Sequence, residues 1–155
     1  MGATEDRPIA PYARASLLVG DVANPGLISC TRESTAAEVA QMLHRGECSA
    51  AVIREHGAAT GEGRVWGVVS HEDLVRAVAA DDPRISAEAL ARTPAIRVRT
   101  DQTVREAARV MDAARVSGLL VIDQNGHATG WLSSADLACV LVSAAPRLSD
   151  GHDDR

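Results

Sequence analysis

The residues best suited to chemistry are two serine–aspartate pairs with the same spacing, Ser70 with Asp73 and Ser133 with Asp136. Each pair follows a glycine and two apolar residues, which are typical of the end of a strand, and precedes a run with helical periodicity. Each serine is therefore predicted to lie at a strand-to-helix junction. Free backbone N–H groups and the helix dipole favour an anion such as phosphate there. An aspartate one turn later can accept hydrogen bonds from hydroxyls such as those of a ribose.

The same spacing has a purely structural interpretation. Ser-x-x-Asp at the start of a helix resembles a capping box, in which the serine is the N-cap and the acidic residue bonds back to its backbone. Two copies at equivalent places argue against a chance occurrence of the pattern. Duplication does not, however, distinguish a helix cap from a ligand contact. From the sequence alone, ligand contact and helix capping both stay open.

An internal repeat supplies the elements that position these pairs. At an offset of 68 residues Ile28 matches Ile96 and Ser49 matches Ser117, and after a longer first hairpin the offset is 63. Each repeat has the order strand, helix, strand, strand, helix. We therefore predict a mixed α/β (α+β) fold of tandem β-α-β-β-α units, in which helices cover one face of each sheet and the two sheets pack together.

The predicted boundaries follow this order along the chain. A short lead-in helix is expected over 15–23. The first repeat then has strands at 27–30, 50–53 and 65–69 and helices at 34–46 and 70–80. After a short helix over 86–92, the second repeat has strands at 96–98, 119–122 and 128–132 and helices from 103 and over 133–143. This divides the chain into a flexible arm (1–14), a first repeat (15–80), a linker helix with the second repeat (81–145) and a disordered tail (146–155).

Composition excludes several classes of function. The chain has 155 residues and a net charge of −5, which argues against binding to nucleic acid or to an anionic membrane surface. All sixteen basic residues are arginine, so a Schiff-base lysine and a P-loop lysine are excluded. The three cysteines are scattered without a CxxC motif, which predicts reduced cysteines and no metal site. The sequence shows neither a bilayer span nor a signal peptide, so a cytoplasmic protein is expected.

No local motif forms a catalytic centre. The glycines from Gly61 to Gly67 lead into a strand rather than a helix, so they do not form a dinucleotide-binding motif. The five histidines are separated, and a triad assembled in space stays open from the sequence. His71 alone is placed for a phosphate contact, because it follows Ser70 at a helix start. We therefore expect no enzymatic activity and name no catalytic residue.

The order of elements, the length and the two Gly-h-h-Ser-x-x-Asp phrases (h meaning apolar) resemble the CBS-domain family, named for cystathionine β-synthase. The resemblance covers about residues 16–145, and the strand entry at 116–123 adds to it. It implies a pseudo-two-fold pair of repeats with two clefts between the sheets. In many members these clefts bind AMP, ADP, ATP or S-adenosylmethionine, so such a regulatory ligand is expected and no other cofactor.

The resemblance assigns roles to individual residues. Asp73 and Asp136 would accept from ribose hydroxyls, and Ser70 and Ser133 would contact phosphate or ribose. The residues before and within the first strand, and those that enter the second strand, would hold the adenine. Each cleft mixes the repeats. The first cleft would combine Ser70, His71 and Asp73 with Ile96, Arg115, Val116 and Ser117, and the second cleft would combine Ser133 and Asp136 with Ile28, Cys48 and Ser49.

The two clefts are expected to differ in charge. Arg115 precedes the strand entry beside the first cleft, where Glu47 stands at the second. A phosphate is attracted by arginine and repelled by glutamate, so a ligand with two or three phosphates would prefer the first cleft. The alternative is that both are solvated turn residues that point away.

The expected function is a stand-alone regulatory module that binds an adenosine-containing ligand and signals through its dimer or an unidentified protein partner. The alternative is a ligand-free CBS-fold scaffold for dimerisation or interaction. The last helix is apolar on every face from Leu137 to Val142, which predicts a homodimer through the helical layer. The lead-in helix over 15–23 covering that face within one chain is the competing interpretation.

Overall fold

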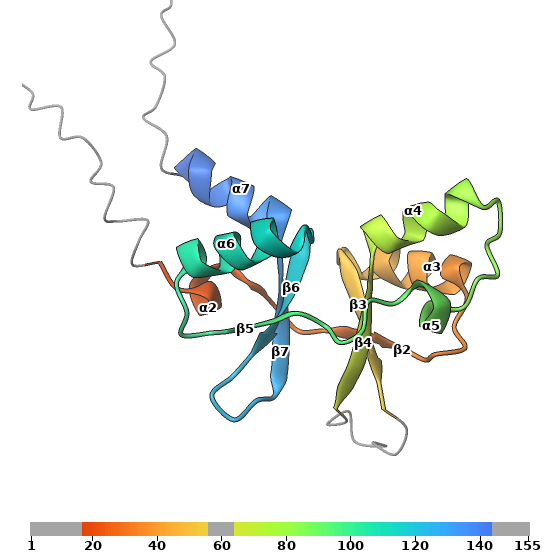
Figure 1. The fold of residues 1–155 in the computed structure, drawn as a ribbon, viewed down its shortest axis with the longest axis horizontal. Coiled ribbons are helices and arrows are strands. Elements are labelled where there is room, and N and C mark those ends of the chain that lie inside the picture. The colour runs from red at the N-terminus through yellow and green to blue at the C-terminus, as the bar shows by residue number, and fades with distance from the viewer. Residues whose placement is uncertain (1–16, 56–63, 144–155) are drawn as a thin grey trace, which may run out of the picture.

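The computed structural model describes residues 17–55 and 64–143, and its strands form two sheets (Figure 1). In the first repeat, β2 (Ile28–Cys30) runs parallel to β3 (Ala50–Arg54), which pairs antiparallel with β4 (Val65–Ser70). In the second repeat, β5 (Arg97–Arg99), β6 (Gly118–Ile122) and β7 (Ala128–Ser133) pair in the same way. The predicted order of elements is therefore confirmed in both repeats. The predicted arm 1–14 and tail 146–155, and most of the first hairpin turn, lie outside the described residues.

Two long helices accompany each sheet, α3 (Ala36–Gly46) and α4 (His71–Ala79) in the first repeat and α6 (Val104–Ala114) and α7 (Ser134–Ser143) in the second. Thr35-x-x-Glu38 and Thr103-x-x-Glu106 form capping boxes at the starts of α3 and α6. The Thr35 N–H donates to the Glu38 carboxylate at 2.8 Å, and the Thr103 N–H donates to that of Glu106 at 2.8 Å. In the part of the chain that the structure describes, none of the helices has the length and apolar character to cross a membrane.

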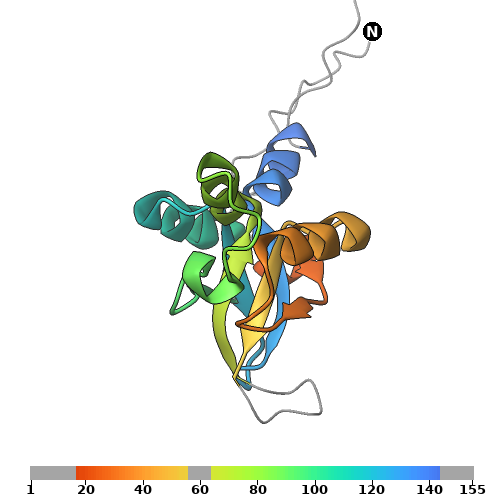
Figure 2. The ribbon, with the colours of Figure 1, turned by 90° about the vertical axis from the view of Figure 1, so that its right-hand side faces the viewer.

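The two sheets pack against each other through small and branched apolar side chains. Val52, Val68 and Leu120, from strands of both repeats, share one core cluster between the sheets. Figure 1 shows α3 and α5 beside the first sheet and α2 and α6 beside the second, and Figure 2 shows that the hairpins β3–β4 and β6–β7 point the same way. The chain has no phenylalanine, so branched residues and alanine fill this layer.

The two short helices are shorter than predicted, and each packs on the repeat that it does not introduce. The helix expected over 15–23 is α2 (Val19–Val22), and the one expected over 86–92 is α5 (Ala87–Leu90). Asp21 accepts the Leu18 N–H at 3.2 Å and so starts α2 after Leu18, and extended backbone at Ala23 ends it. α2 contacts α6 and β5 of the second repeat, whereas α5 contacts α3, α4 and β4 of the first. The segment after α2 also crosses over, because β1 (Asn24–Pro25) pairs with β7.

The apolar residues that the sequence places on one side of α4 are not all buried. Leu74 packs against the core of the first repeat, whereas Val75 is 61% exposed and Val78 is 80% exposed. The buried residues of α4 are Asp73 and Ala77, which are four positions apart and share a face. The helix is rotated because Asp73 turns inward to bond with Ser70. Val75 and Val78 therefore point to the outside.

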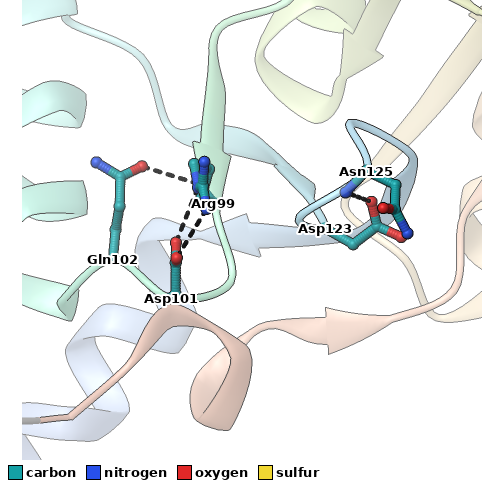
Figure 3. A network of polar contacts seen from close by, with 5 residues as sticks. All are labelled: Arg99, Asp101, Gln102, Asp123 and Asn125. Atoms are coloured by element: carbon teal, nitrogen blue, oxygen red, sulfur yellow. Dashed lines mark hydrogen bonds and ion pairs between the residues drawn. The ribbon is translucent and has the colours of Figure 1, made fainter.

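Polar contacts fix the turns at the outer end of the second repeat (Figure 3). The Arg99 guanidinium donates to both carboxylate oxygens of Asp101 at 2.9 and 2.8 Å, and these bonds lower the pKa of Asp101. In the β6–β7 turn, Asp123 Oδ1 accepts from the N–H groups of Asn125 at 2.8 Å and His127 at 2.9 Å. These two turns set the ends of β5, β6 and β7 and so hold the second sheet in register.

Candidate functional site

Both serine–aspartate pairs form the same local structure at the end of a strand. Asp73 Oδ2 accepts from the backbone N–H of Ser70 at 2.8 Å and from its hydroxyl at 2.9 Å. Asp136 Oδ2 accepts from the N–H and hydroxyl of Ser133 at 2.7 and 2.8 Å. The capping interpretation is thus correct in both repeats. Each cap uses only one oxygen of its aspartate carboxylate.

The second oxygen of Asp73 is available to a donor. Asp73 is 7% exposed, and its Oδ1 forms an ion pair with Arg76 Nη2 at 3.6 Å, which is longer than a hydrogen bond. Arg76 Nη2 donates instead to the Leu90 carbonyl oxygen. Among the described residues, then, no group donates a hydrogen bond to Asp73 Oδ1. Capping and ligand contact are compatible at this residue.

A small cavity of about 20 Å³, open to solvent, lies between the repeats beside Asp73. Five residues that the sequence assigned to the first cleft are in its wall: Ser70, Asp73, Ile96, Val116 and Ser117. The remaining wall residues are Val68, Glu72, Arg92, Ala95, Gly118 and Trp131. The cavity therefore has two carboxylates at a helix start, Glu72 and Asp73, an apolar side and one cation.

Sequence reasoning missed Arg92, the cation of this wall. Arg92 precedes the second repeat, but its backbone pairs with the edge of β4: the Arg92 N–H donates to the Val68 carbonyl at 2.9 Å, and the Val68 N–H donates back at 3.1 Å. This pairing brings the linker to the cleft. The only sequence signal is that Arg92 and Asn24 are 68 residues apart and so occupy equivalent places before the two repeats.

Trp131 was also missed and is the large aromatic side of the cavity. The indole covers the backbone of Gly118, where a Cβ atom would lie 2.2 Å from Trp131 Cζ2. The sequence analysis offered no reason to place either residue in the cleft. In the first repeat Ala50 stands at the position of Gly118, and Val68 stands at the position of Trp131. The first repeat therefore has no indole at this place.

Two residues assigned to the first cleft lie outside the wall of this cavity. His71 is exposed on α4. Arg115 has a positive φ of 52° at the C-terminal cap of α6 and lines a separate hollow with Met111 and Leu137. Glu47, its counterpart, has a φ of 51° at the end of α3 and is exposed. The positive charge in the cavity wall therefore comes from Arg92 and not from Arg115, and it stands beside the carboxylates of Glu72 and Asp73.

The residues assigned to the second cleft are arranged differently. Asn24 Nδ2 donates to Asp136 Oδ1 at 2.9 Å, so both oxygens of this carboxylate accept hydrogen bonds. Of the apolar residues assigned to this cleft, Ile28 and Cys48 pack against the core of the first repeat, and the Cys48 thiol donates to the Gly46 carbonyl at 3.2 Å. Ser49 is half-buried at the entrance to β3.

The family model for the CBS domain matches residues 19–80 and 87–143, two consecutive copies. The chain belongs to the CBS-domain family. This agrees with two sheets of equivalent order and with a cavity between them. The tandem CBS pair inferred from the sequence is confirmed.

Known proteins extend this assignment. The CBS domain protein PAE2072 of Pyrobaculum aerophilum, solved in complex with AMP, is 27% identical with a TM-score of 0.69, and the match covers 83% of this chain and 98% of that one. The CBS domain pair of protein MJ0100, solved with 5′-methylthioadenosine and S-adenosyl-L-methionine, has a TM-score of 0.71 with the same coverage of the two chains. At 20% identity that likeness shows the fold.

A relative with a longer chain is the magnesium transporter MgtE of Thermus thermophilus. It is 29% identical over 126 residues, which are 81% of this chain. The chain spans only 27% of that transporter's length. The shared region is therefore one part of a larger protein in that case.

Proposed function

We propose that this CBS pair is a regulatory module that binds an adenosine-containing ligand in the first cleft. Candidate ligands are AMP, ADP, ATP and S-adenosylmethionine. The cavity beside Asp73 carries the proposal, because the Asp73 carboxylate, with an Oδ1 that accepts no hydrogen bond from the described residues, lines it together with Arg92. The complex of the Pyrobaculum CBS protein with AMP supports a nucleotide as the ligand. The role is regulatory rather than catalytic.

Each feature of the cleft matches one part of such a ligand. Asp73 Oδ1 would accept from ribose hydroxyls, since a diol supplies the donor that this oxygen lacks. The N-terminus of α4 and the Arg92 guanidinium would attract a 5′-phosphate. Ile96, Val116 and the Trp131 indole would enclose the base. The indole narrows the cavity, so a bound base requires its side chain to move.

Thermal denaturation with each of the four ligands tests this proposal. A ligand at a hundred times its Kd stabilises the native state by about 2.7 kcal/mol, which raises Tm by several degrees. Asp73→Asn should abolish the increase. Glu106→Gln is the matched control, because Glu106 is also a capping carboxylate but lies outside the cavity wall. No increase with any ligand would favour the alternative function, a ligand-free interaction scaffold.

A homodimer through the helical layer is the second part of the proposal. Val75 and Val78 on α4 and Leu141 and Val142 on α7 are between 61% and 80% exposed. The two helices lie at the same end of the molecule in Figure 1 and Figure 2. The lead-in helix does not compete strongly for this surface, because α2 packs on α6 and β5. A second copy would remove these side chains from water, and the pair would then signal to a protein partner in the cytoplasm.

Light scattering at micromolar concentration tests the dimer. Val78→Ser combined with Leu141→Ser should give a monomer with an unchanged fold. Leu18→Ser is the control, because Leu18 is also exposed and apolar but does not belong to α4 or α7. A monomeric wild-type protein would refute this part of the proposal.

A further inference from the structure

Asn24 and Arg92 occupy equivalent positions in the two clefts. They are 68 residues apart, and each precedes the first main strand of its repeat. Each also pairs by its backbone with the last strand of the other repeat, Asn24 with Trp131 on β7 and Arg92 with Val68 on β4. The backbone geometry is shared, so the difference between the clefts at this position is one of side chain.

At the second cleft the Asn24 side chain satisfies the acceptor that a ribose would need. Its amide donates to Asp136 Oδ1 at 2.9 Å, while Oδ2 holds the N–H and hydroxyl of Ser133. Hydroxyls that approach this carboxylate must first displace the amide. The hydrogen bond to a charged acceptor is among the stronger kinds, so the displacement weakens binding.

At the first cleft the equivalent side chain leaves the acceptor open. Among the described residues, Asp73 Oδ1 has no hydrogen-bond donor, although Asp73 is 7% exposed and lines the cavity. This oxygen forms only a 3.6 Å ion pair with Arg76, so it can still accept a hydrogen bond from a hydroxyl. Arg92 lies in the same wall and adds a positive charge.

We infer that the residue at this position decides which cleft takes the nucleotide. Arg92 makes the first cleft a site for an adenosine 5′-phosphate, whereas Asn24 acts as a built-in substitute for the ribose and closes the second. The chain therefore binds one nucleotide tightly rather than two. This inference rests on the proposed function and specifies its site and stoichiometry.

Titration calorimetry with AMP on the full chain tests the inference. Wild type should show one tight site per chain. Asn24→Ala should strengthen binding at the second cleft by about tenfold or more, the effect of removing a competing hydrogen bond to a charged group. Arg92→Asn should weaken the first site by a similar factor. The exchange of both residues, Asn24→Arg with Arg92→Asn, should move the tight site to the second cleft, where Asp136→Asn then abolishes it.

A ligand-free measurement isolates the side-chain contact itself. In urea denaturation, the changes in the free energy of unfolding caused by Asn24→Ala and Asp136→Asn should be non-additive. The changes caused by Arg92→Ala and Asp73→Asn should be additive. Two equal sites in wild type, or an unchanged second site in Asn24→Ala, would overturn this inference and leave the proposed function standing. AMP binding to neither wild type nor Asn24→Ala would overturn both.

Discussion

Gly118 and Trp131 form a close contact, which can be tested by enlarging residue 118 and shortening residue 131. A Cβ atom at position 118 would lie 2.2, 2.5 and 2.7 Å from three atoms of the Trp131 indole, all closer than real contacts allow. The indole must therefore move in Gly118→Ala. Overpacking of this kind costs about 1–3 kcal/mol, and for a chain of this size we expect a fall in Tm of about 3–8 °C.

The first repeat shows how the strain can be relieved. The positions equivalent to 118 and 131 hold Ala50 and Val68, which coexist in the core between the sheets. Trp131→Val should therefore make room for Gly118→Ala. We expect Gly118→Ala to lower the free energy of unfolding much less in the Trp131→Val protein than in wild type, with a coupling energy of about 1–2 kcal/mol between the two positions.

Urea denaturation followed by circular dichroism measures all four proteins of this cycle, because the signal does not depend on Trp131. Tryptophan fluorescence of Gly118→Ala should also shift to the red as the indole moves toward solvent. Wild-type stability in Gly118→Ala, or fully additive costs in the double variant, would refute the assigned contact.

Three further predictions concern caps and titrating groups. Thr103→Ala removes the hydroxyl that accepts the Glu106 N–H at 3.2 Å and should lower the free energy of unfolding by about 1 kcal/mol, measured by denaturation. Burial raises the pKa of the Cys30 thiol to about 11. The native state therefore keeps this proton where the unfolded chain loses it, so stability should fall as pH rises from about 9 to about 11, and Cys30→Ala should flatten that decline in alkaline denaturation curves. The Arg99 guanidinium lowers the pKa of Asp101, so the contribution of this ion pair to stability should be lost when acidification protonates Asp101. Arg99→Gln should raise the pKa of Asp101 in an NMR titration.

Much of the fold could be predicted because its signals are local. The capping boxes at Thr35 and Thr103 need only residues three positions apart, and both form with nearly the same distances. The duplicated Ser-x-x-Asp phrase placed Ser70 and Asp73 at a helix start for the same reason. Repetition then supplied the architecture, since two equal units must bury the same faces.

The errors arise where distant segments meet. The apolar residues of α4 do not reveal that Val75 and Val78 lie on the outside, because the buried face of the helix includes Asp73, which turns inward to bond with Ser70. Arg92 and Asn24 reach the clefts only because β1 and the linker lie along the other repeat. Such pairing over more than a hundred residues, as between Asn24 and Asp136, leaves no local pattern.

Because α2 packs on the second repeat and α5 packs on the first, the two repeats cannot be separated without loss of contacts in both. Val19 on α2 is fully buried in the core of the second repeat, and Leu90 on α5 is buried in that of the first. A cut between the repeats therefore strips apolar cover from both halves, and neither half is a self-sufficient folding unit. Unfolding should be one cooperative transition, and a nucleotide that bridges the repeats should protect backbone amides throughout both sheets from hydrogen exchange.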